Sequence, residues 1–489
     1  MPAAIITLLR PLIGTQAAEV AAVIAWPLML FAVMLALVAA ITRRLAPEAA
    51  RTAIVIAGIG YPVTTLFAPG RIDHHGLQIV LMLIALRALL AVPGWASGAV
   101  AGAAMATSLI VGMELAPVLG LMALSVWVAW WWGRGGTSGQ LAGLGTGLAS
   151  GLAIGAAVFA TSGWNYAACD SFTRQLWIIA QVGAAIPLVL GLASPVLGSR
   201  SLRMAASLGL GGMLALPLLP FAQACASPYG AVDPLVSRLW LDHVGEAQSL
   251  FAAPLATTLA YGGLLIAGIA ATAWQVARAP HPGWALLLAI TLAALGVACF
   301  ELRGVYAGVV AGVPALAVVI GAARARGALW LAGAWLGSAG MLYPIAAQAL
   351  VADSPATPGC DAQAALARLV PATIMAPIDV GAYTVAQSRH RVIAAPYHRN
   401  NAGNAAMYHF FLGTPDSARV IAGEWRVDYV LLCPGDFAEI DRATARNPHT
   451  VLAQLRAGHP PPWLIPVGGL PRAQLWRVAA RLREAPRAD

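Results

Sequence analysis

Charged side chains are scarce in this sequence, and lysine is absent from it. Only 10% of the 489 residues are charged, whereas 60% are hydrophobic. A soluble domain usually carries about a quarter charged residues, so a single buried core cannot use this much apolar sequence. The basic residues are all arginine, and the net charge is +9. Because the arginines sit in short loops between apolar runs, membrane topology explains them, and we expect no nucleic-acid partner.

Three further features are missing. We find no basic leader with a small-residue cleavage site and expect no secretory signal peptide. The first 13 residues are apolar but interrupted by Arg10 and Pro11, and they are too short to cross about 30 Å of hydrocarbon, so we expect them at the membrane interface. The lack of a Cys-x-x-Cys pair excludes a zinc ribbon. No tandem repeat of about 20–50 residues is visible.

What the sequence does contain is a series of apolar runs of about 17–25 residues, the length that a membrane helix needs. The runs fill the first 350 residues and predict an α-helical polytopic membrane protein with about twelve transmembrane helices. They lie at 18–42, 50–68, 77–93, 96–112, 114–133, 141–162, 175–194, 204–223, 250–273, 282–300, 304–322 and 328–350.

Arginine placement predicts the orientation of these helices. Alternate loops hold Arg43, Arg44, Arg51, Arg134, Arg200, Arg203, Arg278, Arg324 and Arg326. The positive-inside rule makes these loops cytoplasmic. The remaining loops, which include residues 71–75, 224–249 and 301–303, then face outward. An alanine-, glycine- and proline-rich composition without lysine is typical of a GC-rich genome, and we expect a multi-pass protein of a bacterial inner membrane.

The composition changes after residue 352. Residues 1–352 form the predicted membrane domain, whereas 353–489 carry polar residues in ordinary amounts and alternate short β-like runs with helical ones. This pattern predicts a small α/β domain on the periplasmic side. An oxidising compartment permits disulfides, and the outer cysteines offer two bridges, Cys169–Cys225 and Cys360–Cys433, with free thiols as the alternative.

The segment GRIDHHGLQ (70–78) places four polar or ionisable groups in a row at the edge of the bilayer. Such groups need solvent, partners or a metal there. Asp73 and His75 are two residues apart, so in a turn at a helix start both can face one point, as an oxygen and nitrogen ligand pair for a divalent ion. His74 would then face a neighbouring group or a phosphate. The alternative is an aspartate that caps the helix, beside surface histidines.

Two other outward segments carry ionisable residues next to helix starts. The end of the long loop, HVGEAQS (243–249), places Glu246 just before a helix. There it serves either a site or only the helix dipole. Arg303 follows Glu301 at the outer end of another helix. Arginine suits phosphate recognition, and the alternative is an interfacial arginine that reaches lipid headgroups.

Together these segments resemble the oligosaccharyltransferase catalytic-subunit family, which are C-type membrane glycosyltransferases with polyprenyl-linked donors. The second acidic motif of that family can take the form Asp-x-His, which here is Asp73-His74-His75. Its fifth outer loop carries Ser-Val-Ser-Glu-x-Gln-Pro, and VGEAQS (244–249) keeps Val, Glu and Gln in register. Arg303 stands where that family places an arginine that contacts the pyrophosphate. The order of these motifs along the chain also agrees.

The resemblance implies an inverting transfer of a sugar or glycan from a polyprenyl (pyro)phosphate to a protein or glycan acceptor. Asp73, His75 and Glu246 would be the catalytic residues and would hold Mg²⁺ or Mn²⁺. Arg303 and His74 would bind the donor pyrophosphate. The lipid bilayer is the remaining expected partner.

The sequence departs from the family at two motifs. The family's first outer loop contributes an acidic metal ligand, and the chain begins at about the end of that loop, so we expect an N-terminally truncated homologue or a misassigned start. The family's Trp-Trp-Asp-Tyr-Gly motif, which reads the acceptor, is missing. The alternatives are therefore a polyprenyl-phosphate-dependent transferase that acts on lipid or polysaccharide, a transporter or flippase, and an inactive truncated homologue.

Overall fold

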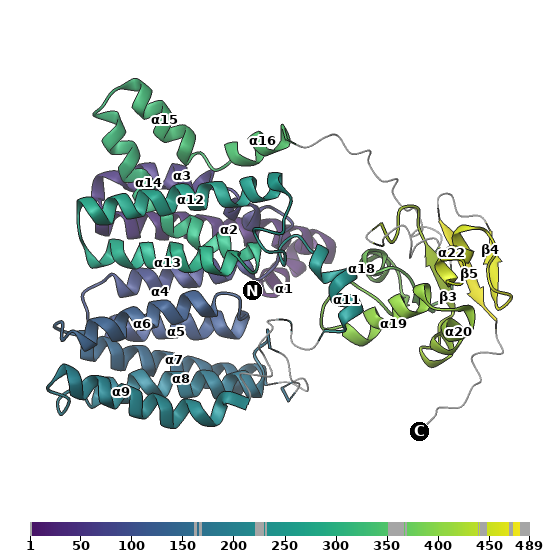
Figure 1. Cartoon of the computed structure of the whole chain (residues 1–489), viewed down its shortest axis with the longest axis horizontal. Coiled ribbons are helices and arrows are strands. Elements are labelled where there is room, and N and C mark those ends of the chain that lie inside the picture. The colour runs from purple at the N-terminus through teal and green to yellow at the C-terminus, as the bar shows by residue number, and fades with distance from the viewer. Residues whose placement is uncertain are drawn as a thin grey trace. The chain divides into compact units, whose positions relative to one another are not determined.

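The computed structural model divides the chain into two compact units, which we describe separately (Figure 1). The first comprises Met1–Gly230 and Gly245–Ala352, and the second comprises Ala231–Val244 and Asp353–Asp489. The structure describes residues 2–160, 164–165, 169–220, 229, 232–350, 366, 369–438, 440, 447–468 and 473–479.

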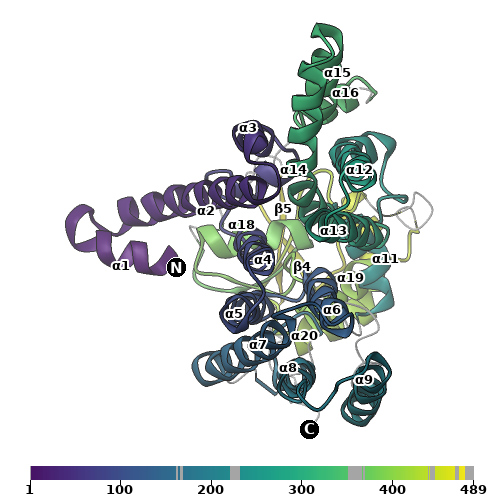
Figure 2. The same cartoon turned by 90° about the vertical axis from the view of Figure 1, so that its left-hand side faces the viewer.

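The first unit is built of helices, most of which run side by side with nearly parallel axes (Figure 1). Figure 2 views many of these helices end-on, while α1 and α2 extend to one side of the bundle. The α-helices are α1 (Pro2–Ile13), α2 (Thr15–Leu45), α3 (Ala50–Gly58), α4 (His75–Leu89), α5 (Trp95–Val111), α6 (Ala116–Trp131), α7 (Thr137–Phe159), α8 (Arg174–Leu192), α9 (Arg200–Ala215), α12 (Leu255–Arg278), α13 (Pro282–Ala298), α14 (Val305–Arg324), α15 (Ala328–Ser338) and α16 (Leu342–Gln348). Short 3-10 turns accompany them in this unit at η1 (Pro47–Ala49), η2 (Val63–Phe67), η3 (Leu216–Leu218) and η5 (Leu302–Gly304).

The prediction of twelve spanning helices is wrong. Among the described residues, 6 helices are long and apolar enough to cross a membrane, and the bent pair α15 and α16 would make a seventh. Each of the twelve apolar runs contains helix, but several helices are too short. The run 50–68 breaks after Gly58, and the run 328–350 bends by 76°. Mean hydropathy along the sequence does not detect such breaks, because the residues that form these turns are themselves mostly apolar.

Helix α14 lies at the centre of the helical unit. It packs against α12, α13, α2 and α3, and it is buried along most of its length. The crossing with α12 is close because two glycines meet there: a Cβ atom on Gly312 would lie 2.8 Å from the Cα of Gly268. Small residues allow such close backbone contact. In a lipid bilayer the hydrophobic effect does not drive helices together, so they associate through van der Waals packing of this kind. The 3-10 turn η5, which contains Arg303, leads directly into this tightly packed helix.

The end of α6 is tied to the segment that leads into α9. The indole Nε1 of Trp130 donates to Ser194 Oγ at 2.6 Å, and that of Trp127 donates to Ser207 Oγ at 2.9 Å. Arg203 donates to the backbone oxygen of Trp130 at 2.6 Å. These contacts use the polar tips of tryptophans whose rings are otherwise apolar. The tryptophans at the end of α6 therefore anchor this helix end to its neighbours.

The second unit contains the expected small α/β arrangement. Its five-stranded sheet has the order β2-β1-β3-β5-β4, where β1 is parallel to β2 and β3, and β5 is antiparallel to β3 and β4. The strands are β1 (Thr373–Met375), β2 (Arg391–Val392), β3 (Tyr429–Leu432), β4 (Leu464–Val467) and β5 (Gln474–Val478). The helices are α11 (Pro234–Leu239), α18 (Ile378–Gln387), α19 (Asn401–Leu412), α20 (Pro415–Glu424) and α22 (Val451–Arg456).

The part of the chain between 231 and 244 packs with the second unit, although the sequence placed it in the first domain. Asp233 caps α11 by accepting from the backbone N–H of Leu235, and its own N–H donates to Asn401 on α19 at 2.8 Å. Val236 is fully buried in the same core. The long loop therefore contributes one helix to the α/β unit before Glu246 returns to the helical unit.

Two of the predicted bridge cysteines lie among the described residues. Cys169 and Cys433 are both disulfide-bonded. Their expected partners, Cys225 and Cys360, lie outside the described residues, so each pairing stays a prediction. Cys299, at the end of α13, is a free thiol.

Candidate active site

Ionisable side chains stand at the starts of α4, α6 and α14 and in the loop that leads to α12, and contacts between these side chains bring the segments together. The N-terminus of a helix carries a partial positive charge and unpaired N–H groups, which favour anions. The end of the bundle where α4, α6 and α14 begin is therefore suited both to carboxylates and to a phosphorylated ligand.

Arg71 links the turn before α4 to the loop before α12, which contains Glu246. Its Nε donates to Asp73, and its Nη2 donates to Glu246 Oε1 at 2.9 Å. Asp73 also accepts from the backbone N–H of His75 at 3.1 Å, so it holds the turn at the start of α4. One guanidinium thus lies between two carboxylates. Asp73 is two residues from Arg71 in sequence, and Glu246 is 175 residues from it.

His74 links the start of α4 to the start of α6, where Glu114 lies. Its Nε2 lies 2.8 Å from Glu114 Oε1, and the other carboxylate oxygen of Glu114 accepts from Gln78 Nε2 at 2.9 Å. His75 Nδ1 lies 3.4 Å from Gln78 Oε1, while its Nε2 lies 3.4 Å from Glu246 Oε2. Both histidines are therefore turned toward carboxylates from other parts of the chain.

The pairings set the charges of the cluster. Burial raises the pKa of Glu114, but the hydrogen bond and charge of His74 outweigh it and lower the pKa to about 2. The hydrogen bond of Glu114 in turn raises the pKa of His74. The hydrogen bond of His75, with the charge of Arg71, lowers the pKa of Glu246 to about 2 despite burial. Both glutamates are therefore ionised at neutral pH, which is the state that binds a cation.

Arg303 approaches the same cluster from the start of α14. Its Nε donates to Glu301 at 2.6 Å, and its Nη2 donates to Tyr229 Oη at 2.6 Å. Its Nη1 lies 3.9 Å from Glu114 Oε1. The guanidinium is only 16% exposed, so these partners fix its direction and leave it beside the cluster.

Backbone hydrogen bonds hold the loop with Glu246 against the turn with Arg303. The N–H of Leu302 donates to Gln248 at 2.8 Å, that of Leu250 donates to Ala298 at 2.9 Å, and that of Arg303 reaches Glu246 at 3.4 Å. These bonds explain why two motifs that are far apart in sequence face each other. The position of Glu246 is therefore set by the backbone as well as by its salt bridge.

Gly112 leaves room for Glu114. A Cβ atom on Gly112 would lie 2.3 Å from Glu114 Oε2 and 3.0 Å from Gln78 Nε2. A side chain at position 112 would make the Glu114 carboxylate shift and would disturb its hydrogen bond with Gln78. The loop between α5 and α6 is shaped around this carboxylate.

The cluster contains side chains that could hold a divalent metal ion. One ligand atom each from His74, His75 and Glu114 lie within 4.8 Å of one another, and bonds of about 2.0–2.2 Å to one ion would draw these atoms closer together. Two imidazoles and one carboxylate suit first-row transition ions better than Mg²⁺, which prefers oxygen. The residues present therefore fit a metal, although the set differs from the predicted Asp73, His75 and Glu246.

The structure brings together the residues that the sequence singled out. Asp73, His74, His75, Glu246 and Arg303 all belong to the cluster. Sequence reasoning missed Glu114 and Gln78, and it gave Arg71 no role of its own. Glu114 left a signal, because it is the only ionisable residue between Arg87 and Arg134 and it falls between two apolar runs.

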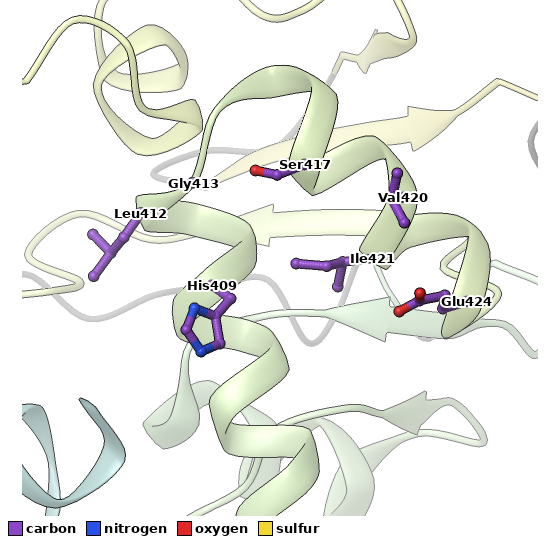
Figure 3. Close-up of a pocket in the computed structure, with 7 residues that line it drawn as sticks. All are labelled: His409, Leu412, Gly413, Ser417, Val420, Ile421 and Glu424. Atoms are coloured by element: carbon purple, nitrogen blue, oxygen red, sulfur yellow. The ribbon is translucent and has the colours of Figure 1, made fainter. Parts of the chain in front are cut away.

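A separate pocket of about 510 Å³ lies within the second unit (Figure 3). It is formed where α19 ends and α20 begins, and its lining includes His409, Ser417, Ile421 and Glu424. In Figure 3 the imidazole of His409 and the carboxylate of Glu424 stand apart along the pocket. None of the site residues predicted from the sequence lines it.

The helices and the fold define a multi-pass membrane protein of the oligosaccharyltransferase type of fold. The sequence matches no protein-family model and no curated protein. The structure, in contrast, aligns over 85% of the chain with archaeal oligosaccharyltransferase AglB from Archaeoglobus fulgidus.

Three of the matching structures show how far the likeness in fold extends. The TM-score is 0.61 for AglB in complex with an inhibitory peptide and a dolichol-phosphate, 0.60 for the apo form, and 0.52 for the complex with Zn and sulfate. Sequence identity is 16% in each case. The chain spans about three-fifths of the length of these proteins, 59% for the first two and 56% for the third.

Proposed function

We propose that this protein is a membrane glycosyltransferase that transfers a sugar or glycan from a polyprenyl (pyro)phosphate donor to an acceptor at the periplasmic face of a bacterial inner membrane. The observation that carries the proposal is the convergence of Arg71, Arg303, two histidines and three carboxylates from the starts of α4, α6 and α14 and from the loop before α12. The likeness in fold to AglB, which was solved with a dolichol-phosphate, supports a lipid-linked donor.

Arg303 and His74 are the residues that we assign to the donor phosphates. Arg303 is held by Glu301 and Tyr229, so its guanidinium is oriented before a ligand arrives. A preorganised cation stabilises the negative charge that develops on a leaving phosphate without reorganisation at the moment of reaction. His74 is the more exposed histidine, at 43% against 11% for His75, and it can reach a ligand from solvent.

A divalent cation would be held by His75 and the carboxylates around it, among Asp73, Glu246 and Glu114. When bound, it would offset negative charge on the donor phosphates and favour departure of the lipid phosphate. Because two imidazoles border the cluster, we favour Mn²⁺ over Mg²⁺. The AglB complex with Zn and sulfate is consistent with a transition ion in this fold.

Two observations bear on the acceptor, and they favour different kinds of molecule. AglB was solved with an inhibitory peptide, which favours a protein acceptor. The sequence lacks the tryptophan-containing motif by which the resembling family reads a peptide, and this favours a lipid or polysaccharide acceptor. The assay therefore has to detect both products.

Donor binding is tested first. The full chain in detergent is titrated with undecaprenyl pyrophosphate, and binding is followed by native mass spectrometry. Charge-assisted hydrogen bonds are worth about 1.5–3 kcal/mol, so Arg303→Ala should weaken binding about tenfold or more. Arg324→Ala is the matched control, because this exposed arginine lies at the other end of α14. Equal affinities for both variants would remove Arg303 from the site.

Transfer is tested with the lipid-linked glycans extracted from the cells that produce the protein. We expect a covalent product on a peptide or on a lipid or polysaccharide acceptor, and Arg303→Ala and Asp73→Ala should abolish it while the protein still inserts into membranes. Movement of the glycolipid across vesicles with no covalent product would instead make the protein a transporter.

A further inference from the structure

Two polar side-chain atoms at the start of α8 are buried without a hydrogen bond. Thr173 is the N-cap residue of this helix and is 3% exposed, yet its Oγ1 neither caps the helix nor finds another partner among the described residues. The indole Nε1 of Trp177, one turn further along α8, is buried and has no partner there either. Buried polar groups are nearly always paired, because an unpaired one loses its hydrogen bonds to water and gains none in return. A bound ligand would supply the missing partners.

The tryptophans at the end of α6 show the usual arrangement. The Nε1 groups of Trp127 and Trp130 donate to serine hydroxyls, and that of Trp131 donates to a backbone oxygen. A tryptophan N–H that is buried usually finds a partner of this kind within the chain. Trp177 therefore differs from tryptophans that only anchor helix ends.

Three aromatic rings gather at the same helix start. The centre of the Trp164 ring lies 6.1 Å from that of Trp177 and 5.4 Å from that of Phe172. The backbone oxygen of Trp164 accepts from the N–H of Arg174 at 2.9 Å, and this bond holds Trp164 against α8. Binding sites for small molecules are mostly lined by apolar and aromatic side chains with a few polar groups that fix the orientation of the ligand. The start of α8 has this composition.

The start of α8 is also close to the loop that carries Glu114. A Cβ atom on Gly155 of α7 would lie 2.3 Å from Ile110 Cδ1 and 3.5 Å from Phe172 Cε1. Ile110 belongs to the last turn of α5, and the loop from α5 to α6, which contains Glu114, begins two residues later. A ligand that is larger than a phosphate can therefore extend from the candidate active site toward the start of α8.

We propose that the start of α8 binds saccharide units of the lipid-linked donor and that Thr173 and Trp177 form hydrogen bonds with sugar hydroxyls. This inference rests on the proposed function and adds a binding region for the glycan. A sugar ring offers hydroxyl oxygens to N–H and O–H donors, and its C–H face packs against aromatic rings. A phosphate would instead favour arginine, and Arg174 beside Thr173 is exposed. A site built to hydrogen-bond a hydroxyl rejects a ligand that lacks it.

Two lipids that differ in their sugars test the proposal. The full chain in detergent is titrated with undecaprenyl pyrophosphate, which has no sugar, and with the lipid-linked glycan extracted from the cells that produce the protein. Native mass spectrometry measures both affinities. We expect the glycan to increase the affinity about tenfold or more, which corresponds to about 1.4 kcal/mol. Thr173→Val and Trp177→Phe should each remove most of this increase. Both variants should still bind undecaprenyl pyrophosphate, which shows that they are folded.

The matched controls are Thr146→Val and Trp127→Phe. The polar atoms of these residues are paired within the chain, Thr146 Oγ1 with the backbone oxygen of Ala142 and Trp127 Nε1 with Ser207. Both controls should keep the full increase in affinity.

Three results would overturn the inference. The first is a glycan that adds no affinity in the unmodified protein, and the second is an increase that survives both Thr173→Val and Trp177→Phe. The third is a loss of bound phosphatidylglycerol in these variants with unchanged glycan binding, which would assign the region to a membrane lipid. In all three cases, binding of undecaprenyl pyrophosphate by the unmodified protein would leave the proposed function standing. A protein that binds neither lipid would refute both.

Discussion

The two ends of α6 use arginine in opposite ways. Before its first residue, the carboxylate of Glu114 is approached by His74 and Arg303. Beyond its last turn, Arg203 donates to backbone oxygens of Leu197 and Trp130 and lies over the ring of Trp130. The helix has 16 residues, so at about 1.5 Å per residue the two ends are roughly 24 Å apart.

The comparison distinguishes arginines that only stabilise the fold from arginines that belong to a candidate functional site. At the tryptophan end, Arg203 donates to carbonyl oxygens, and Arg203 and Arg200 lie over tryptophan rings, so these arginines fix helix ends without a carboxylate partner. At the carboxylate end, arginines and histidines are balanced against acids from distant segments. Such clusters at the membrane edge cost free energy to assemble unless function requires them. Substitutions at the two ends should therefore affect different properties.

The largest effect is expected for Arg71→Ala. It leaves Asp73 and Glu246 without their shared cation, and loss of one partner of a partly buried ion pair should cost about 2–3 kcal/mol of folding free energy. It should also weaken binding of undecaprenyl pyrophosphate, because a positive charge leaves the site. Unfolding in mixed detergent micelles measures the first effect, and titration with the lipid measures the second.

A double-mutant cycle makes this prediction specific. If the cost of Arg71→Ala comes from the unpaired carboxylate, Arg71→Ala combined with Glu246→Ala should be less destabilising than the sum of the single variants. Arg203→Ala at the tryptophan end serves as the comparison, since it should lower stability without changing lipid affinity. Weaker lipid binding by Arg203→Ala would remove the distinction between the two ends.

Gly112→Ala should have the next largest effect. The added methyl group would overlap Glu114 Oε2, and overpacking of this kind costs about 1–3 kcal/mol. Because the carboxylate must move away from Gln78, we expect Mn²⁺ affinity to fall by about tenfold, or about 1.4 kcal/mol. The control is Gly120→Ala on α6, where a Cβ atom would meet nothing within 4 Å. Unchanged Mn²⁺ affinity in Gly112→Ala would show that Glu114 is not a ligand.

Much of the helical architecture could be predicted from the sequence, because long apolar runs have few alternatives in a bilayer. The lengths of the helices could not. The run 50–68 reads as one span, yet the chain leaves the helix after Gly58 and forms a 3-10 turn from Val63. The residues between are Ile-Gly-Tyr-Pro, where glycine and proline disfavour helix. Hydropathy alone does not weigh such residues, and this explains the overestimate of spanning helices.

The site was predictable where polar residues stand together. Asp73, His74 and His75 are adjacent in sequence, and Glu246 and Arg303 stand at recognisable helix starts. The pairings between them were not predictable, because they join positions that lie far apart in sequence, such as Arg71 and Glu246. Glu114 is a single acid without a motif, and only the folded chain shows that it pairs with His74 and lies near His75. Local patterns therefore locate such a site, whereas its ligand set depends on tertiary contacts.

A moderate effect on stability alone is expected for Trp130→Phe. The indole of Trp130 is 1% exposed and donates to Ser194, so phenylalanine loses a hydrogen bond of about 0.5–1.5 kcal/mol and leaves a small cavity. Mn²⁺ affinity and lipid binding should equal those of the unmodified protein. Ser194→Ala removes the same bond from the other side and should be no more costly. A change in Mn²⁺ affinity would mean that the two ends of α6 are coupled.

The smallest effect is expected for Arg200→Ala. The guanidinium lies 4.5 Å from the centre of the Trp132 ring, and an exposed cation–π contact is worth about 0.5–1 kcal/mol. The hydrogen bond from Trp131 reaches the backbone oxygen of Arg200, so it survives the substitution. Arg200→Lys keeps the positive charge and should recover part of the loss. If Arg200→Ala reduces membrane insertion more than stability, this arginine acts through topology, as the positive-inside rule predicts for an arginine in a short loop between spanning helices.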